Sequence, residues 1–169
     1  MANKIDFSQD EWKTLLQSPL IVGVAVLASE PSGFFGMLKE SMASAHALVA
    51  AKADPNADAL VKAVAADFET SEGRTLARDG LKETIAGAQP GEIKMKAVGA
   101  LRQIPAIVDA KAPADAEAFK RWLAGVAKSV AEAASEGGFL GFGGVQVSDA
   151  EKATLAEISA ALGIPAASA

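Results

Sequence analysis

The sequence predicts an all-α protein, a single-domain bundle of about seven helices over residues 1–169. The first observation is compositional: 50% of the residues are hydrophobic, largely through alanine, and only 5% are aromatic, which favours helices over strands. The second is periodicity, because apolar residues recur at spacings of three and four and no alternating run is long enough to predict a strand. The length of the chain and the lack of a linker-like segment indicate one domain.

The first helix is predicted to begin after Ser8, because Ser8 and Glu11 have the spacing of a capping box. Its apolar face reaches Pro19, which removes a backbone donor and predicts either a kink or the start of a new helix. Residues 20–28 are apolar on nearly every side, a pattern typical of a helix surrounded by other helices. They form the predicted central helix.

Further helical patterns follow in the first half of the chain. Apolar spacing predicts one helix from Phe35 to about residue 52 and another over residues 60–68. Gly73 is expected to end or interrupt that second helix. Residues 77–85 continue the pattern, although Gly80 costs this segment about 1 kcal/mol relative to alanine.

The second half begins with a helix predicted over residues 93–108. Pro105 lacks the N–H that a helix interior needs, so a bend or a change of helix is expected near residues 102–105. Pro113 and the acidic residues after it indicate the next helix start, and this helix carries the clearest apolar stripe, with Lys120 outside it. The last helix is expected to begin at a second capping box and to end at glycine and proline, through Ser148, Glu151, Gly163 and Pro165.

Two corners of the chain repeat one plan. Residues 28–36 read Ala-Ser-Glu-Pro-Ser-Gly-Phe-Phe-Gly, and residues 134–144 read Ala-Ser-Glu-Gly-Gly-Phe-Leu-Gly-Phe-Gly-Gly. In both segments Ala-Ser-Glu closes an apolar helical pattern, and helix breakers, aromatic residues and glycine follow. This repetition is consistent with an internal pseudo-twofold repeat in which two apolar helices end in similar corners.

Composition excludes several classes of function. The net charge of -5 opposes binding to phosphate backbones, so nucleic acid is not an expected partner. The chain has no cysteine, which rules out disulfides, thiolate metal sites and cysteine nucleophiles. Residues 1–10 lack a secretory signal pattern, and the longest uncharged apolar run is about half of the ~20 residues that span a bilayer. We therefore expect a soluble cytoplasmic protein without membrane contact.

The C-terminal part resembles a known family. Val147-Ser148, Glu151-Lys152, Leu155, Ile158 and Leu162-Gly163 are similar to the end of the tellurite-resistance TerB-like helical domains, with a weaker similarity at residues 20–36. The resemblance implies a stress-related role and, for some members of that family, metal binding by acidic residues at the corner. Gly143-Gly144 stand where the family has Asp-Gly, so the resemblance does not carry the metal site over. The chain also resembles a bacterial all-helical family that shares the segment 136–144.

Glu30 and Glu136 are candidate ligand or metal residues, because each closes one of the two repeated helices. If these helices pack as a pair, the two carboxylates would face one cavity, raise each other's pKa, and act as an acid and a base or hold a hard cation. The alternative, which we favour, is that each carboxylate accepts hydrogen bonds from free N–H groups of its own corner.

His46 and Asp67 are the other candidate ligands. His46 is the only histidine, and without a Glu-x-x-His pair it cannot build a two- or three-histidine metal site, so we expect a structural role. Asp67 lies at the edge of an apolar helical face and is expected to be partly buried. Pairing with Arg74 or Arg78, or capping of a neighbouring helix, is the role predicted for Asp67.

Phe139, Leu140 and Phe142 are candidate interaction residues, because large apolar side chains here alternate with glycine. They either fill the core between helices or form an exposed patch that binds a partner. The segment lacks the Gly-Lys-Ser/Thr ending of a phosphate-binding loop and does not follow a strand, so a nucleotide loop is not predicted.

The sequence offers no complete set of nucleophile, base and orienting group. The leading hypothesis is therefore a non-enzymatic helical protein that acts through protein–protein contacts, as a homo-oligomer or an adaptor. The alternative is a protein or enzyme that binds a small ligand or a divalent metal through Glu30 and Glu136. No cofactor is predicted.

Overall fold

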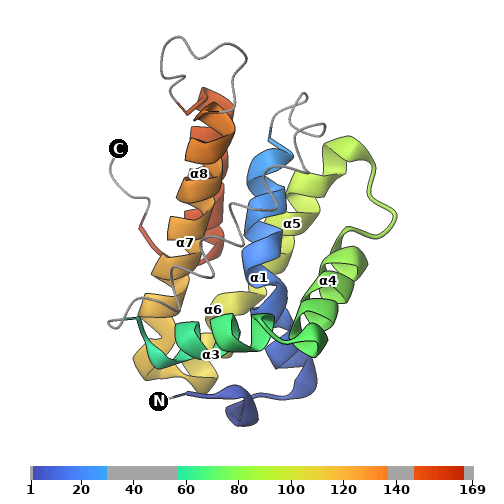
Figure 1. Cartoon of the computed structure of the whole chain (residues 1–169). Helices are drawn as coiled ribbons and strands as arrows, with labels where there is room; N and C mark the ends of the chain where they lie inside the picture. The colour runs from blue at the N-terminus through green and yellow to red at the C-terminus, as the bar shows by residue number, and fades with distance from the viewer. Residues whose placement is uncertain (1, 30–56, 137–146, 166–169) are drawn as a thin grey trace.

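The computed structural model describes residues 2–29, 57–136 and 147–165, with residues 134–136 as helix backbone (Figure 1). Throughout these ranges the chain is helical and has no strand, so the predicted all-α class is confirmed. The helix predicted from residue 35 to 52 lies outside the described residues. The elements are η1 (Lys4–Asp6), α1 (Gln9–Leu27), α3 (Ala59–Phe68), α4 (Ser71–Ile85), η3 (Pro90–Glu92), α5 (Ile93–Leu101), α6 (Gln103–Lys111), α7 (Pro113–Glu136) and α8 (Asp149–Ala161).

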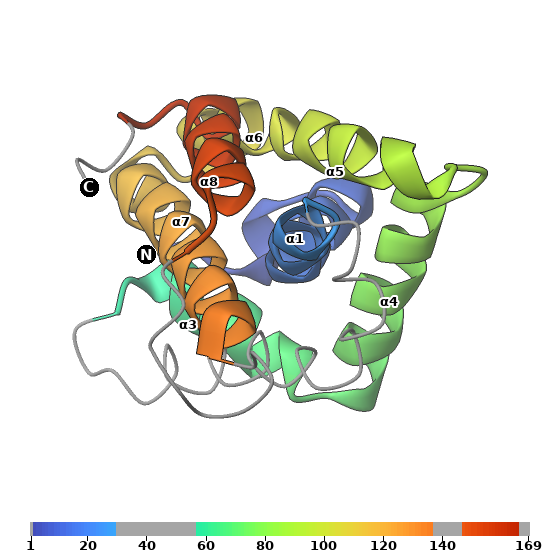
Figure 2. The ribbon, with the colours of Figure 1, turned by 90° about the horizontal axis from the view of Figure 1, so that it is seen from above.

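Helix α1 occupies the middle of the bundle, as the sequence predicted. Seen from above, it stands end-on inside a ring formed by the other helices (Figure 2). It packs most extensively against α4, α5 and α7 and also contacts α3, α6 and α8. Leu15, Leu16, Val22 and Ala25 are fully buried because neighbours cover every side of the helix. Burial on this scale, rather than helix propensity, is the main stabilising contribution to such a helix.

Helix α1 runs through Pro19 without interruption, so of the two alternatives that the sequence left open, a kink or a new helix, the new helix is excluded. Pro19 has no N–H to donate to the carbonyl of Leu15, which a regular helix would require. The hydroxyl of Ser18, which is fully buried, donates a hydrogen bond to that carbonyl at 2.6 Å. The lost backbone bond is therefore replaced by a side chain one residue away.

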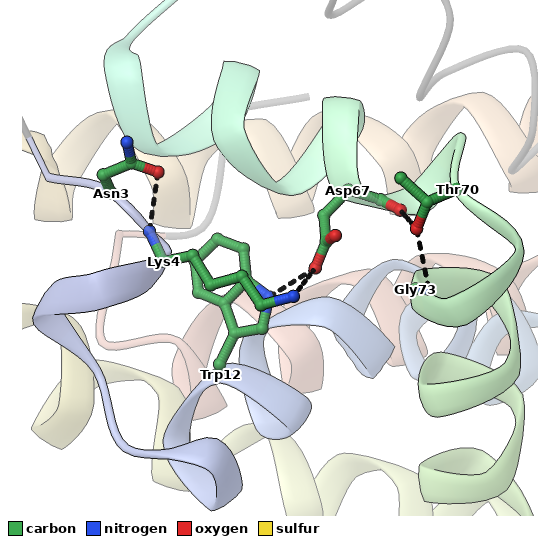
Figure 3. A network of polar contacts seen from close by, with 6 residues as sticks. All are labelled: Asn3, Lys4, Trp12, Asp67, Thr70 and Gly73. Carbon is green, nitrogen blue, oxygen red and sulfur yellow. Dashed lines mark hydrogen bonds and ion pairs between the residues drawn. The ribbon is translucent and has the colours of Figure 1, made fainter.

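Gly73 does not end a helix, contrary to the expectation from sequence. The break comes earlier, between the end of α3 at Phe68 and the N-cap residue Thr70, whose hydroxyl accepts a hydrogen bond from the Gly73 N–H at 2.8 Å. A Cβ atom on Gly73 would collide with the carbonyl oxygen of Asp67 and lie 2.7 Å from its carbonyl carbon. Gly73 therefore allows α3 and α4 to meet in a tight corner (Figure 3).

The remaining boundaries follow the predictions. Helix α5 gives way to α6 at Arg102, so that Pro105 falls in the first turn of α6, where its missing N–H is not needed. Pro113 opens α7, and Ser148 and Glu151 form the predicted capping box of α8. Gly163 follows α8 with φ of 69°, and the Ile164 N–H donates to the Ser159 carbonyl at 3.0 Å, which closes the helix as a Schellman motif.

None of the helices in the described ranges combines the length and the apolar character that crossing a membrane requires.

Candidate functional site

The side chain of one predicted ligand residue, Asp67, is described. Glu30, His46, Phe139, Leu140 and Phe142 lie outside the described residues. Glu136 is described as the last backbone position of α7, without its side chain. The predictions for these residues therefore stay predictions.

The helices that lead to the two repeated corners do lie together. Helices α1 and α7 pack against each other, and in Figure 1 both run toward the same end of the bundle. The backbone at the end of α1 and at Glu136 thus belongs to one end of the molecule. This arrangement meets one condition for the paired-glutamate hypothesis, namely that α1 and α7 end at the same end of the bundle.

The carboxylate of Asp67 lies where η1, α1 and α3 meet. Its Oδ2 atom accepts a hydrogen bond from the Trp12 indole Nε1 at 2.7 Å and from the Lys4 ammonium at 3.1 Å (Figure 3). The Asp67 side chain is 15% exposed, so the expectation of partial burial is confirmed. Asp67 sits in the last turn of α3, and this turn faces the start of the chain.

The expected pairing of Asp67 with Arg74 or Arg78 is wrong. The guanidinium of Arg74 instead donates to the backbone carbonyl of Glu69 and to the hydroxyl of Ser71, close to its own helix start. The partners of Asp67 come from the chain start because Trp12 is almost completely buried at 2% exposure. A buried indole N–H needs an acceptor, and Asp67 supplies it.

The Asp67 contact belongs to a longer fixed segment, which we call the N-terminal arm (Ala2–Phe7). Asn3 and Asp6 satisfy each other in a capping box around η1. Lys4 is held by Asp67, and the ring of Phe7 is buried against Trp12 with 5.7 Å between the ring centroids. The arm is therefore tied to α1 and α3 by both polar and apolar contacts.

The other end of the arm is attached to α7. The backbone N–H of Ala2 donates a hydrogen bond to Oδ2 of Asp115 at 3.1 Å, in a buried position. From the sequence, Asp115 was recognised only as an acidic residue near a helix start, and no local spacing connects it to Ala2. Sequence reasoning therefore missed this contact.

Two further polar contacts between helices were also missed. Lys120, which the sequence placed outside the apolar stripe, is buried to 8% exposure, and its ammonium lies 3.1 Å from Oδ1 of Asp109. The side chain of Gln17 is buried against α4, where a Cβ on Gly80 would meet its amide oxygen. Both contacts join helices, and neither forms a pair of catalytic groups.

Within the described ranges, no three histidine, aspartate or glutamate side chains gather closely enough to hold a metal ion. Asp67 would have to exchange its contacts with Trp12 and Lys4 for a metal, and one of those donors is buried. The chemistry that this arrangement supports is therefore the attachment of the N-terminal arm to the bundle.

Fold and contacts together define an all-α helical protein in which the buried or partly buried side chains of Asp67, Asp115 and Lys120 attach separate parts of the chain to one another. No family model, curated protein or solved structure matches the chain.

Proposed function

We propose that this chain is a non-enzymatic helical protein that acts through protein–protein contacts, as a homo-oligomer or as an adaptor. The observation that carries the proposal is the exposed side chain of Ile5 on a fixed backbone. Ile5 is 89% exposed, whereas Ala2 and Phe7 in the same arm are buried. An isolated exposed apolar residue is common on protein surfaces, so the rigid attachment of the arm is what distinguishes this one.

The arm holds Ile5 in place before any partner binds. The capping box of η1 fixes the backbone around it, and Lys4 next to it contacts Asp67. A partner that covers Ile5 would not have to order this segment, which reduces the entropic cost of association. Burying an isoleucine side chain then contributes about 1.5–3 kcal/mol.

The uses of the buried charged groups also favour a binding protein over an enzyme. Asp67 is engaged by Trp12 and Lys4, and Lys120 is engaged by Asp109. We include Phe139, Leu140 and Phe142 as a second interaction surface on the basis of sequence. A stress-related cytoplasmic role is part of the proposal and rests on the TerB-like resemblance.

The test compares Ile5→Ser with the matched control Met95→Ser, because Met95 is the other large apolar residue with high exposure in the described ranges, at 67%. Sedimentation velocity over a range of protein concentrations measures self-association, and quantitative co-purification from the native cells measures other partners. We expect Ile5→Ser to weaken association while its unfolding midpoint stays unchanged, and Met95→Ser to have little effect.

Variants Phe139→Ser and Phe142→Ser test the second surface in the same way. If all of these variants fold and keep the mass and the partners of the original chain, the proposal is refuted.

A second candidate function is binding of a divalent cation by Glu30 and Glu136. It is favoured by one observation: α1 and α7 pack together and end at the same end of the bundle (Figure 1). Thermal unfolding with magnesium, calcium or manganese tests it, since a ligand at a hundred times its Kd adds about 2.7 kcal/mol of stability. Glu30→Gln and Glu136→Gln should each abolish the shift, whereas Asp67→Asn should retain it. The absence of a shift with every cation would eliminate this function.

A further inference from the structure

Helix α4 lies directly on the central helix α1 and forms one side of the ring around it (Figure 2). The close approach is possible because the buried residues of α4 are small: Ala77 and Gly80 in its middle, and Gly73 at the corner with α3. A Cβ on Gly80 would lie 2.3 Å from the side-chain amide oxygen of Gln17 in α1. The contact between α1 and α4 is therefore close but buries little apolar surface.

The other α-helices of the described ranges are held on the core by large apolar side chains. The largest fully buried side chains come from α1, α3, α5, α6, α7 and the end of α8, and none of them belongs to α4. Helix α4 contributes only Ala77 to the buried core, and its Leu76 and Leu81 are partly buried against that core. Because burial of apolar surface is the main force that holds a helix on a bundle, α4 is the least strongly held of these helices.

Two lysine contacts hold the end of α4. The ammonium of Lys13 in α1 pairs with the carboxylate of Glu83, and the ammonium of Lys96 in α5 donates a hydrogen bond to the Ala86 carbonyl at 2.7 Å. The Glu83 side chain is 68% exposed, and the contact of Lys96 also lies at the surface. Water competes with both contacts, so each of them adds little to the attachment of α4.

The two ends of α4 are joined to the chain in different ways. At its start, the Thr70 hydroxyl donates to the Asp67 carbonyl at 2.7 Å and accepts a hydrogen bond from the Gly73 N–H, which fixes the corner with α3 (Figure 3). After its end, residues 86–92 are mostly exposed, and Gly87 in this connection has φ of 67°. The connection to α5 can therefore change its conformation without disturbing the core.

We propose that α4 is a lid on the central helix, which opens by turning about its corner with α3 while the rest of the bundle stays folded. Opening breaks the two lysine contacts, removes Ala77 from the core and uncovers the buried side chain of Gln17 on α1. Segments with few buried apolar contacts and exposed connections open in this way without global unfolding. The proposal does not depend on the exposure of Ile5.

The lid gives the protein two forms that present different surfaces. The closed form covers one side of α1, and the open form exposes this side together with the inner face of α4. A partner that binds only the open form shifts the equilibrium toward it, by as much as its affinities for the two forms differ. The lid is therefore a device that controls access to the central helix.

The test places a single thiol under the lid, because the chain has no cysteine of its own. Ala77→Cys carries the thiol in α4, and Ala97→Cys in α5 and Ala127→Cys in α7 are matched controls, since all three alanines are at most 1% exposed. Alkylation under native conditions, relative to the rate in denaturant, measures how often each thiol becomes accessible. We expect the thiol in α4 to react about tenfold faster or more than both controls. Equal relative rates for the three proteins would overturn the proposal.

Removal of the lysine contacts should open the lid further. In the Ala77→Cys protein, Lys13→Ala or Lys96→Ala should each raise the alkylation rate by about two- to fivefold, the range expected for the loss of one exposed contact. Lys82→Ala is the matched control, because Lys82 pairs with Asp79 inside α4 and should leave the rate unchanged. An equal acceleration by Lys82→Ala would mean that α4 unravels by itself instead of lifting from α1, and would refute the lid.

Hydrogen exchange of the unmodified chain keeps the proposal testable if Ala77→Cys does not fold. Backbone amides in the second half of α4 should exchange about tenfold faster or more than those in the middle of α7. Their exchange should also depend less on urea than global unfolding does, because opening of the lid exposes less surface. Protection of α4 equal to that of α7 would contradict the proposal.

Discussion

The hydroxyl of Ser18 donates a hydrogen bond to the carbonyl of Leu15 at 2.6 Å, at the point where Pro19 leaves that carbonyl without its helical donor. Both Ser18 and Leu15 have no exposed surface, so water cannot replace the missing bond. A serine directly before the proline thus preserves the continuity of α1, the helix that the other described helices surround.

Ser18→Ala should lower the free energy of unfolding by about 1–3 kcal/mol, because it leaves the buried Leu15 carbonyl without a donor. The same substitution in a Pro19→Ala background should cost much less, since an alanine at position 19 restores the backbone N–H. Urea unfolding of the four proteins measures the coupling between the two sites. An equal loss in both backgrounds would mean that Ser18 acts by packing alone.

Gly73→Ala and Gly125→Ala make the same substitution at two helix positions, and we expect them to change the stability of the protein in opposite directions. A Cβ on Gly73 would collide with the backbone of Asp67, so the corner between α3 and α4 must shift, and we expect a loss of about 1–3 kcal/mol. Gly125 lies on the exposed side of α7 with open space around its Cα, so alanine should stabilise the protein by about 0.5–1 kcal/mol. Thermal unfolding of both variants checks the contrast, and a loss of stability for Gly125→Ala would contradict it.

The substitutions at Asp67 should separate its hydrogen bond from its charge. Asp67→Ala leaves the buried Trp12 N–H without an acceptor and should cost about 1–3 kcal/mol, whereas Asp67→Asn keeps an oxygen for it and should cost less. Lys4→Ala should cost at most about 1 kcal/mol, because the Lys4 side chain is 48% exposed. Indole NMR shifts and unfolding free energies report on the two effects. If Lys4→Ala proved as damaging as Asp67→Ala, the charge would be the main contribution.

Glu11 should make stability depend on pH in the acid range. The pKa of Glu11 is lowered from 4.5, first by the hydrogen bond from the Ser8 backbone N–H to its carboxylate, against a smaller opposing effect of desolvation. The pKa of Glu11 is lower in the folded protein than in the unfolded chain. The stabilisation that Glu11 contributes is therefore present above pH 4.5 and is lost as the pH falls through the pKa of the folded state. Glu11→Gln should therefore be less stable than the original chain at neutral pH, and the gap should narrow in acid. Unfolding curves at several pH values measure this gap, and a gap that widened in acid would contradict the assignment.

Features within one helical turn could be predicted from the sequence. The pairs Ser8 with Glu11 and Ser148 with Glu151 both form the capping boxes that their spacing indicates, since each pair is joined by local backbone geometry. The central position of α1 could also be predicted, because a helix that is apolar on every side has to be covered by others.

Contacts between distant residues could not be predicted in this way. The partners of Asp67 lie 55 and 63 positions away, so no local spacing distinguishes them from Arg74, which is near in sequence. The buried Trp12 was the available signal, because its indole N–H requires an acceptor somewhere in the fold. Gly73 was misjudged for a related reason: glycine in a helical pattern is found both at helix ends and at close approaches, and only the position of Asp67 decides between the two.

The place of α1 has a consequence for biosynthesis. This helix precedes the other α-helices in the described part of the chain, yet one of the helices that it contacts, α8, is the last of them to be made. Until the ribosome has completed the polypeptide, the apolar side chains of α1 are not yet covered by α8, and contacts between residues so distant along the chain also slow folding. We expect chaperones to recognise nascent chains through residues 15–26, and truncations that remove α8 to aggregate rather than to yield a smaller folded protein.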